Sequence, residues 1–290
     1  MPPKAIVTVQ YHFDAVSQWL HNFGLWERPG KHQRGIFGCN KVPLLLDICD
    51  ELDVPATWFI PGHTIDSFPE LCGEVWDRGY TIECHGWTHD PETAFGSREA
   101  EKADFERAID SIYDLTGQKP TGYGSRLWDY SKHTLSIIQE LGFDWDSSLM
   151  GRDFKPYYVR DGWSAPEDGP YDPGEETDVL EIPLSWKRDD WPPLQFEWGL
   201  DNQWIANEKE LFNTWFEQFD YMYDHFDHGV YNITFHPQII GRAPRPRYHR
   251  ELMEKMKERP GVEFMSMADA AKEIKANEDL WIADSIEMTP

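Results

Sequence analysis

Short apolar runs alternate along the chain with longer segments in which apolar residues recur at helical spacing. The runs at 5–9 and 56–60 are rich in β-branched and aromatic residues, as buried strands are. The segment between them is helical by its spacing, with apolar positions at Val42, Leu45, Leu46, Cys49 and Leu52. Strands that alternate with helices in this way predict βα units and a mainly parallel sheet.

The same pattern continues to the end of the chain. Further strands are predicted at 80–84, 179–182 and 231–235, and further helices at 69–78, from about 105 to 117 and at 131–141. The segment 161–177 is rich in proline, glycine and acidic residues and is predicted to be a loop excursion. With no internal repeat, residues 1–290 are predicted to form one α/β domain shaped like a barrel.

Composition narrows the possible partners. The chain carries 52 acidic against 27 basic residues, and its formal net charge of -25 argues against nucleic acid or an anionic membrane. No early segment joins a basic start to an apolar core, and no apolar stretch is long enough to span a bilayer. We therefore expect a cytoplasmic protein that acts on a small-molecule substrate, with its four scattered cysteines reduced.

Four residues that could carry chemistry follow predicted strands: Asp14, His85, His89 and His236. The carboxyl ends of parallel strands are where active sites gather in α/β barrels and open sheets. Two imidazoles and one carboxylate leave a metal ion an open position for water and substrate. A pair of histidines four residues apart also occurs by coincidence on helix faces, so the pair alone does not establish a metal site.

Several motifs together resemble the polysaccharide deacetylase (NodB-homology) family. They are Phe13-Asp14-Ala15-Val16, His85-x-x-x-His89, Gly122-Tyr123 with Trp128, and Thr234-Phe235-His236-Pro237. Stretches at 55–59, 61–63, 153–158 and 181–183 are similar to its intracellular branch, which includes a Helicobacter peptidoglycan deacetylase-like protein, allantoinases of this fold and cyclic imide hydrolases. The resemblance implies an irregular (β/α) barrel of about seven strands, a divalent metal that is usually zinc, hydrolysis of a C–N bond, and a homo-oligomer, either dimer or tetramer.

The resemblance also implies roles for individual residues. Asp14, His85 and His89 match the metal ligands of the family, and His236 matches the histidine that protonates the departing nitrogen. An amide nitrogen leaves poorly as an anion, so a general acid is needed, and imidazole suits neutral pH. The alternative for His236 is a structural histidine that fixes a strand end.

His12 departs from the family pattern, which has an aspartate there as the general base. Alternation along an extended segment places His12 on the same side as Asp14, so an imidazole stands where the base is expected. His12 is a candidate base, and the alternatives are a further metal ligand or no chemical role. Glu83 could be a spare carboxylate in the site or a residue behind His85.

The residues expected to bind substrate are Trp87, Arg126, Trp128 and Trp186. Relatives often have an arginine directly after the Gly-Tyr pair, whereas here Arg126 comes two positions later and contacts either substrate or a carboxylate such as Asp129. Aromatic walls suit a compact planar or sugar-like substrate, although ordinary packing explains each tryptophan taken singly.

Three functions are therefore considered. The first is metal-dependent hydrolysis of a small amide, most of all a cyclic amide or imide. The second is N-deacetylation of an amino sugar or oligosaccharide. The third is a non-hydrolytic or inactive member of the family, because His12 replaces the usual aspartate base.

Overall fold

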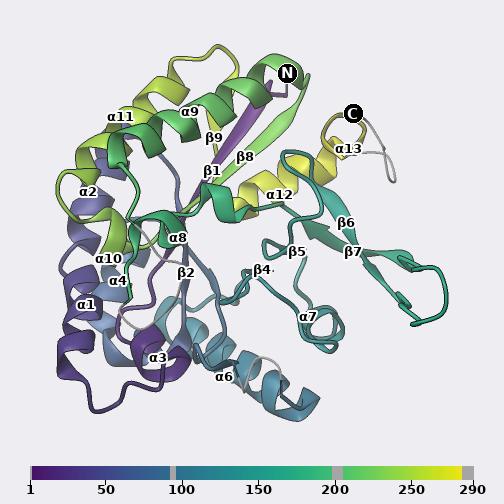
Figure 1. The fold of residues 1–290 in the computed structure, drawn as a ribbon, viewed down its shortest axis with the longest axis horizontal. Coiled ribbons are helices and arrows are strands. Elements are labelled where there is room, and N and C mark those ends of the chain that lie inside the picture. The colour runs from purple at the N-terminus through teal and green to yellow at the C-terminus, as the bar shows by residue number, and fades with distance from the viewer. Residues whose placement is uncertain (1, 92–95, 198–204, 283–290) are drawn as a thin grey trace.

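A curled sheet forms the centre of the computed structural model, which describes residues 2–91, 96–197 and 205–282 (Figure 1). Its described strands are β1 (Ala5–His12), β2 (Thr57–Ile60), β3 (Thr81–Cys84), β4 (Gly122–Tyr123), β5 (Trp145–Asp146), β6 (Tyr157–Asp161), β7 (Glu175–Glu181), β8 (Gly229–Phe235) and β9 (Val262–Phe264). Their order is β6-β7-β5-β4-β3-β2-β1-β8, with β9 also paired to β1. Every pair is parallel except β6 with β7.

The helices surround this sheet on the outside (Figure 1). They are α1 (Pro29–Cys39), α2 (Val42–Leu52), α3 (Gly62–Ser67), α4 (Pro69–Asp77), α6 (Arg98–Thr116), α7 (Thr134–Leu141), α8 (Trp191–Leu194), α9 (Glu208–His225), α10 (Pro237–Ile240), α11 (Arg245–Lys257), α12 (Met267–Ala276) and α13 (Glu278–Trp281), with short turns at Gln18–Asn22 and Trp186–Arg188. The α/β class and the barrel-like architecture expected from the sequence are confirmed.

The barrel is irregular because its wall is thin on one side. Strands β4 and β5 have two residues each. On the other side, a single parallel bridge between Asp189 and Thr234 joins the segment after β7 to β8. This bridge closes the sheet on that side. It places Asp189 and Asp190 beside the carboxyl end of β8, directly before His236, which caps α10.

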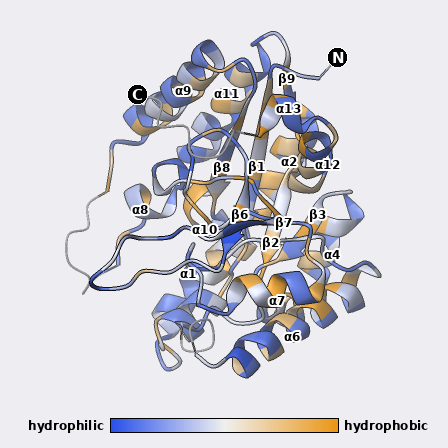
Figure 2. Cartoon of the chain, turned by 90° about the vertical axis from the view of Figure 1, so that its right-hand side faces the viewer, coloured by the Kyte–Doolittle hydropathy of each residue, from blue (hydrophilic) through white to orange (hydrophobic). Residues whose placement is uncertain are grey.

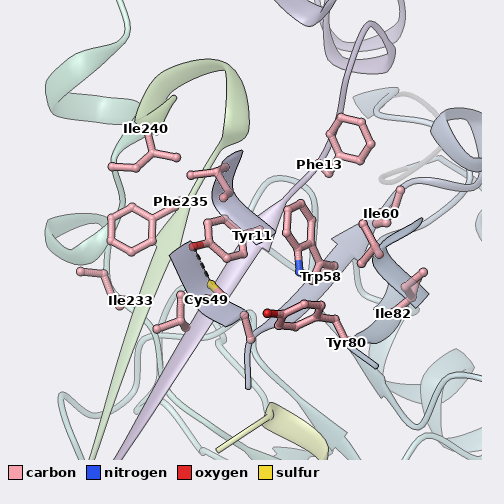
Figure 3. Packing of buried hydrophobic residues seen from close by; sticks show 14 of the residues in the cluster. Tyr11, Phe13, Cys49, Trp58, Ile60, Tyr80, Ile82, Ile233, Phe235 and Ile240 are labelled. Atoms are coloured by element: carbon pink, nitrogen blue, oxygen red, sulfur yellow. Dashed lines mark hydrogen bonds between the residues drawn. The ribbon is translucent and has the colours of Figure 1, made fainter. Parts of the chain in front are cut away.

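Alternate residues of β1 face two different environments. Tyr11 points outward, where its ring stacks on Trp58 at 4.5 Å and its hydroxyl oxygen lies 3.4 Å from Cys49 Sγ of α2 (Figure 3). Its neighbours Gln10 and His12 lie on the opposite face of the strand and are buried inside the barrel. Apolar residues gather on the strands and the inward faces of the helices, and polar residues cover the outside (Figure 2).

The segment 161–177 joins β6 to β7, and between these strands its residues 162–174 form turns and irregular structure with one isolated bridge. Strands β6 and β7 pair antiparallel, and a further bridge joins Ser164 to Asp172, so this segment is the end of a long hairpin that projects from the sheet (Figure 1). The first half of β7 was not predicted as a strand, because its residues Glu175 and Glu176 are both polar and exposed and so show no apolar face. The four cysteines are free and buried, and none of the described helices has the length and hydropathy needed to cross a membrane.

Candidate metal centre and active site

The carboxyl ends of three parallel strands bring together the residues that the sequence singled out. Asp14 follows β1, His85 and His89 follow β3, and His236 follows β8. Asp14 Oδ1 lies 3.6 Å from His85 Nε2 and 3.4 Å from His89 Nε2, and one ligand atom from each of these three residues lies within 4.8 Å of the others. His236 Nε2 lies 3.9 Å from Asp14 Oδ2.

The three ligand atoms are suited to a cation. Both oxygens of Asp14 and the Nε2 of His85 are buried and have no hydrogen-bond partner. The main-chain oxygen of Gly124 accepts a hydrogen bond from His85 Nδ1 at 2.6 Å, which leaves Nε2 with its lone pair directed at Asp14. Burial lowers the pKa of His85 to about 3, so its imidazole is neutral, as a metal ligand must be. For Asp14, burial opposes ionisation, but the imidazoles of His89, His236 and His85 hold its pKa below the ordinary value.

A sharp turn aims Asp14 at the site. Ala15 takes the left-handed conformation with φ of 47°, which a residue other than glycine rarely adopts. The main-chain oxygen of Asp14 accepts hydrogen bonds from Ser17 N at 2.9 Å and from Thr64 Oγ1 at 2.8 Å. These two bonds hold the strained turn, so the carboxylate is positioned by its backbone and remains free to bind a cation.

A buried ion pair holds the loop between the two histidines. Asp104 of α6 accepts hydrogen bonds from the backbone N–H groups of Trp87 and Thr88, each at 3.0 Å. The guanidinium of Arg126 pairs with Asp104 and donates to the Thr88 carbonyl oxygen. Gly86 has φ of 71°, and a Cβ at this position would overlap the guanidinium of Arg126. The guanidinium of Arg126 therefore holds the loop in place through Asp104 and the Thr88 carbonyl. The carboxylate that pairs with Arg126 is Asp104, not Asp129.

An Asp104→Asn variant is expected to unfold about 3 kcal/mol more easily, because the buried guanidinium of Arg126 loses its counter-charge. Its affinity for zinc should also fall at least about tenfold, since the loop no longer holds His85 and His89 together. Denaturant unfolding and zinc titration measure the two effects. Asp110→Asn, on an exposed position of the same helix, is the matched control. Equal unfolding midpoints for the two variants would contradict this role of the pair.

Two carboxylates fix the imidazole of His236 beside Asp14. Its Nδ1 donates to Asp190 Oδ1 at 2.8 Å, and its backbone N–H donates to both oxygens of the same carboxylate at 3.0 and 3.1 Å. Asp189 Oδ1 lies 3.5 Å from the same Nδ1. Although burial opposes the charged form, the carboxylates of Asp189, Asp190 and Asp14 raise the pKa of His236 to about 9. The imidazole is therefore protonated at neutral pH, and its Nε2 faces Asp14.

His12 has the opposite protonation. Its ring centroid lies 4.4 Å from that of His85 and 5.3 Å from that of His236. Burial, together with the nearby imidazoles of His85 and His236, lowers the pKa of His12 well below its ordinary value, and Asp14 opposes the shift only in part. The pKa values of these two histidines in one site are thus shifted in opposite directions.

A cavity of about 120 Å³ opens onto these groups. His12, His89 and His236 line it together with Trp128, Trp186 and Asp189. The rings of Trp128 and Trp186 lie 4.5 Å apart, and Trp128 also approaches His12 edge-on. Trp128 has φ of 50°, an unusual backbone conformation for a bulky residue that aims its ring at the cavity.

The other two residues expected to bind substrate lie differently. Trp87 is not among the described residues that line this cavity. Its Nε1 donates to Asp66 Oδ2 at 2.8 Å, and the guanidinium of Arg107 lies 3.1 Å from its ring centroid. Arg126 contributes to the cavity wall, but its side chain is buried against Asp104. The direction of these side chains depends on how the loop turns at Gly86, which spacing alone does not determine.

Glu83 lies away from the metal ligands. Its carboxylate accepts hydrogen bonds from Thr121 N at 2.8 Å, Thr121 Oγ1 at 3.0 Å and Gly122 N at 2.9 Å, at the start of β4. It therefore joins β3 to β4 and is not a spare carboxylate of the site. Burial raises the pKa of Glu83 to about 7, although the three hydrogen bonds oppose the shift.

A Glu83→Gln variant is expected to be more stable than the wild type at alkaline pH. Because the folded protein holds this proton more tightly than the unfolded chain, wild-type stability falls as pH rises from about 4.5 to about 7. Glutamine has no charge, and its amide oxygen can accept from the two backbone N–H groups while its amide nitrogen donates to Thr121 Oγ1. The advantage of the variant should therefore grow by about 2 kcal/mol between pH 5.5 and pH 8, measured by denaturant unfolding. An advantage that shrinks with rising pH would contradict the assignment.

Gln10 and Asp104 were not found from the sequence as parts of the site, and Asp190, expected in a loop over the site, was not recognised as the partner of His236. Gln10 has a signal in the sequence, because alternation places it on the same face as His12. Asp104 and Asp190 come from a distant helix and from the segment after β7, and only the folded chain brings them to the histidines.

Comparison with known proteins finds relatives that span nearly the whole chain. The sequence profile described as polysaccharide deacetylase matches residues 38–145. The peptidoglycan deacetylase of Helicobacter pylori is 33% identical over 283 residues, which span 93% of this chain and 96% of that protein. A peptidoglycan deacetylase-like protein of Gibberella zeae is 27% identical over 94% of this chain and 87% of its own.

Two solved structures are similar over almost the whole chain. A Mycobacterium smegmatis protein assigned as a polysaccharide deacetylase is 27% identical, with a TM-score of 0.85 over 100% of this chain and 96% of that one. Puue allantoinase has a TM-score of 0.74 over 94% and 91% of the two chains. At 18% identity, this second likeness concerns the fold alone.

Proposed function

Because the chain belongs to the polysaccharide deacetylase family, whose members hydrolyse C–N bonds of amides, we propose that it is a metal-dependent N-deacetylase of an amino sugar or a short glycan. The observation that carries the proposal is the convergence of Asp14, His85 and His89, with orphaned ligand atoms, beside a protonated His236. The two peptidoglycan deacetylase relatives favour this substrate class over the small cyclic amide that the sequence placed first.

The chemistry divides between the metal and the two histidines. Zinc bound by Asp14, His85 and His89 would supply an activated water and polarise the acyl oxygen. His12, which is neutral, takes a proton from the attacking water. His236 gives its Nε2 proton to the departing nitrogen, while Asp190 holds the opposite side of the ring. Cleavage of the amide by one water then releases a carboxylate and an amine.

A larger substrate has a place to extend. Trp186 is half exposed and separates the catalytic cavity from a surface groove of about 800 Å³. The groove also presents Phe154 and Tyr221 beside polar groups such as Gln218. Because the inner cavity of about 120 Å³ admits a small ring or the acetamido end of a sugar but not a whole glycan, the remainder of a glycan would lie along Trp186 toward this groove.

Hydrolysis of a small cyclic amide is the second candidate, and the size of the cavity favours it. A space of about 120 Å³ between aromatic walls suits a five-membered planar ring, because an engineered cavity of about 150 Å³ accepts benzene. The neutral His12 in place of an aspartate is a further difference from the usual family site.

One substrate panel separates the two candidates. Zinc-loaded protein is assayed for acetate release from N-acetylglucosamine, chitooligosaccharides and peptidoglycan fragments, and for ring opening of succinimide, hydantoin and allantoin. We expect acetate release that is lost in a His85→Ala variant. Ring opening without acetate release would favour the cyclic substrate, and no turnover of any compound would contradict both proposals.

We also propose that the protein self-associates. The projecting β6–β7 hairpin carries Trp163 and Tyr171, two aromatic residues that are largely exposed in the single chain. Burial of such side chains favours contact with another subunit. Light scattering of the purified protein is expected to give the mass of a dimer or a tetramer.

A further inference from the structure

A row of buried polar side chains crosses the inside of the barrel beneath His12. Gln10 Oε1 lies 3.1 Å from His12 Nε2, and Gln10 Nε2 lies 2.7 Å from Asn232 Oδ1 of β8. Thr8 Oγ1 lies 3.1 Å from the same Asn232 oxygen, and Ser147 lies between the two amides and the far wall. None of these residues reaches the catalytic cavity, yet the row ends on the residue that stands in place of the usual base.

The surroundings of Asn232, at the end of the row away from His12, determine which atoms donate and which accept between Asn232, Gln10 and His12. The Nδ2 of Asn232 lies 3.5 Å from the main-chain oxygen of Ile182 and 3.4 Å from that of Pro183. Main-chain oxygens only accept, so the amide group of Asn232 that faces them must be its nitrogen. Its oxygen therefore faces Gln10 and requires a donor. Gln10 meets this need with its own amide nitrogen and so presents its oxygen to His12.

An amide oxygen accepts hydrogen bonds and cannot donate them. The Nε2 of His12 must therefore carry a hydrogen, and a neutral imidazole carries only one. We infer that Gln10, oriented by Asn232, fixes His12 in the tautomer with hydrogen on Nε2, which leaves Nδ1 as the ring nitrogen with a free lone pair. This inference rests on the proposed function for the role of His12 as base, and it makes Gln10 a positioning residue.

The arrangement fits both states of a base. Before the reaction, the oxygen of Gln10 accepts from Nε2 of the neutral ring. After Nδ1 gains a proton, the same oxygen still accepts from Nε2 of the charged ring, so no partner has to rotate. A glutamine supplies the acceptor without adding a full negative charge to a site that already holds Asp14 and Asp189.

Nitrogen NMR of the histidine side chains tests the inference directly. In zinc-loaded protein labelled with ¹⁵N, two-bond proton–nitrogen correlations show which ring nitrogen of each histidine carries hydrogen, and a His12→Asn variant identifies the His12 signals. The expected result is hydrogen on Nε2 and a free Nδ1. Hydrogen on Nδ1 would overturn the inference, and so would an Nδ1 bound to zinc, because neither atom could accept a proton.

Two variants separate positioning from general stability. Gln10→Leu removes the acceptor and is expected to shift the tautomer population toward Nδ1–H and to lower kcat about tenfold at unchanged KM. Thr8→Val removes the other donor to Asn232 without touching His12, and it should keep the tautomer and kcat. An unchanged tautomer in Gln10→Leu would overturn the role of Gln10. Since the spectrum is read without substrate, failure of the proposed reaction would leave the tautomer result standing.

Discussion

A His89→Ala variant is expected to lose its metal ion and nearly all of its activity. His89 supplies one of three ligand atoms that lie within 4.8 Å of one another, and the two that remain cannot hold zinc tightly. Loss of a residue behind a ligand already costs about 10–100-fold in metal affinity, so loss of the ligand itself should lower affinity by at least about a hundredfold, with turnover falling accordingly. Metal analysis after dialysis and the rate of amide hydrolysis measure the two effects.

The matched control for this variant is His225→Ala, because His225 is an exposed histidine on α9 far along the chain from the site. This variant should keep both zinc and activity. A His89→Ala protein that retains one zinc per chain and hydrolyses substrate at the wild-type rate would contradict the assignment of the metal centre.

A His236→Asn variant is expected to keep its metal and to lose about a thousandfold in kcat. The reason is that the departing amine nitrogen no longer receives a proton from Nε2, while Asp14, His85 and His89 are unchanged. Substrates with better leaving groups need this proton less, so anilides should lose a smaller factor than alkyl amides. Equal losses on both kinds of substrate would point to a structural role instead.

The pH dependence of the same variant has a definite sign. Carboxylates beside His236 raise its pKa, so the wild type has its acid in the protonated form at neutral pH and loses activity on the alkaline side. His236→Asn should lack this alkaline decline. Asp190→Asn should move the decline toward neutral pH, because it removes the carboxylate that receives the Nδ1 hydrogen bond. An alkaline limb unchanged in both variants would contradict the role of His236 as acid.

The sequence predicts the parts of this site that belong to single strands. Alternation along 5–14 places His12 and Asp14 on one face, and the apolar runs before His85 and His236 predict that both follow parallel strands. Helix ends were also predictable, since Gly117 and Gly142 occupy left-handed positions just after α6 and α7. Each of these features is determined by residues that are close together in the sequence, so a single sequence is enough to predict it.

Contacts between distant segments were not predictable in the same way. The pairing of Arg126 with Asp104 depends on how α6 packs behind the histidine loop, and the direction of Trp87 follows from it. The bridge from Asp189 to Thr234 brings Asp190 to His236 across the seam of the barrel. The antiparallel pairing of β6 with β7 was not predicted, because the residues of both strands nearest the connecting loop are polar and show no alternation of apolar and polar positions.

The most direct test of the metal-dependent mechanism is a zinc titration of metal-free protein, followed by the rate of acetate release from a chitooligosaccharide. We expect activity to rise linearly and to saturate at one zinc ion per chain, with no rise in His89→Ala. Metal-free protein that hydrolyses the substrate as fast as the zinc-loaded protein would contradict a mechanism centred on Asp14, His85 and His89.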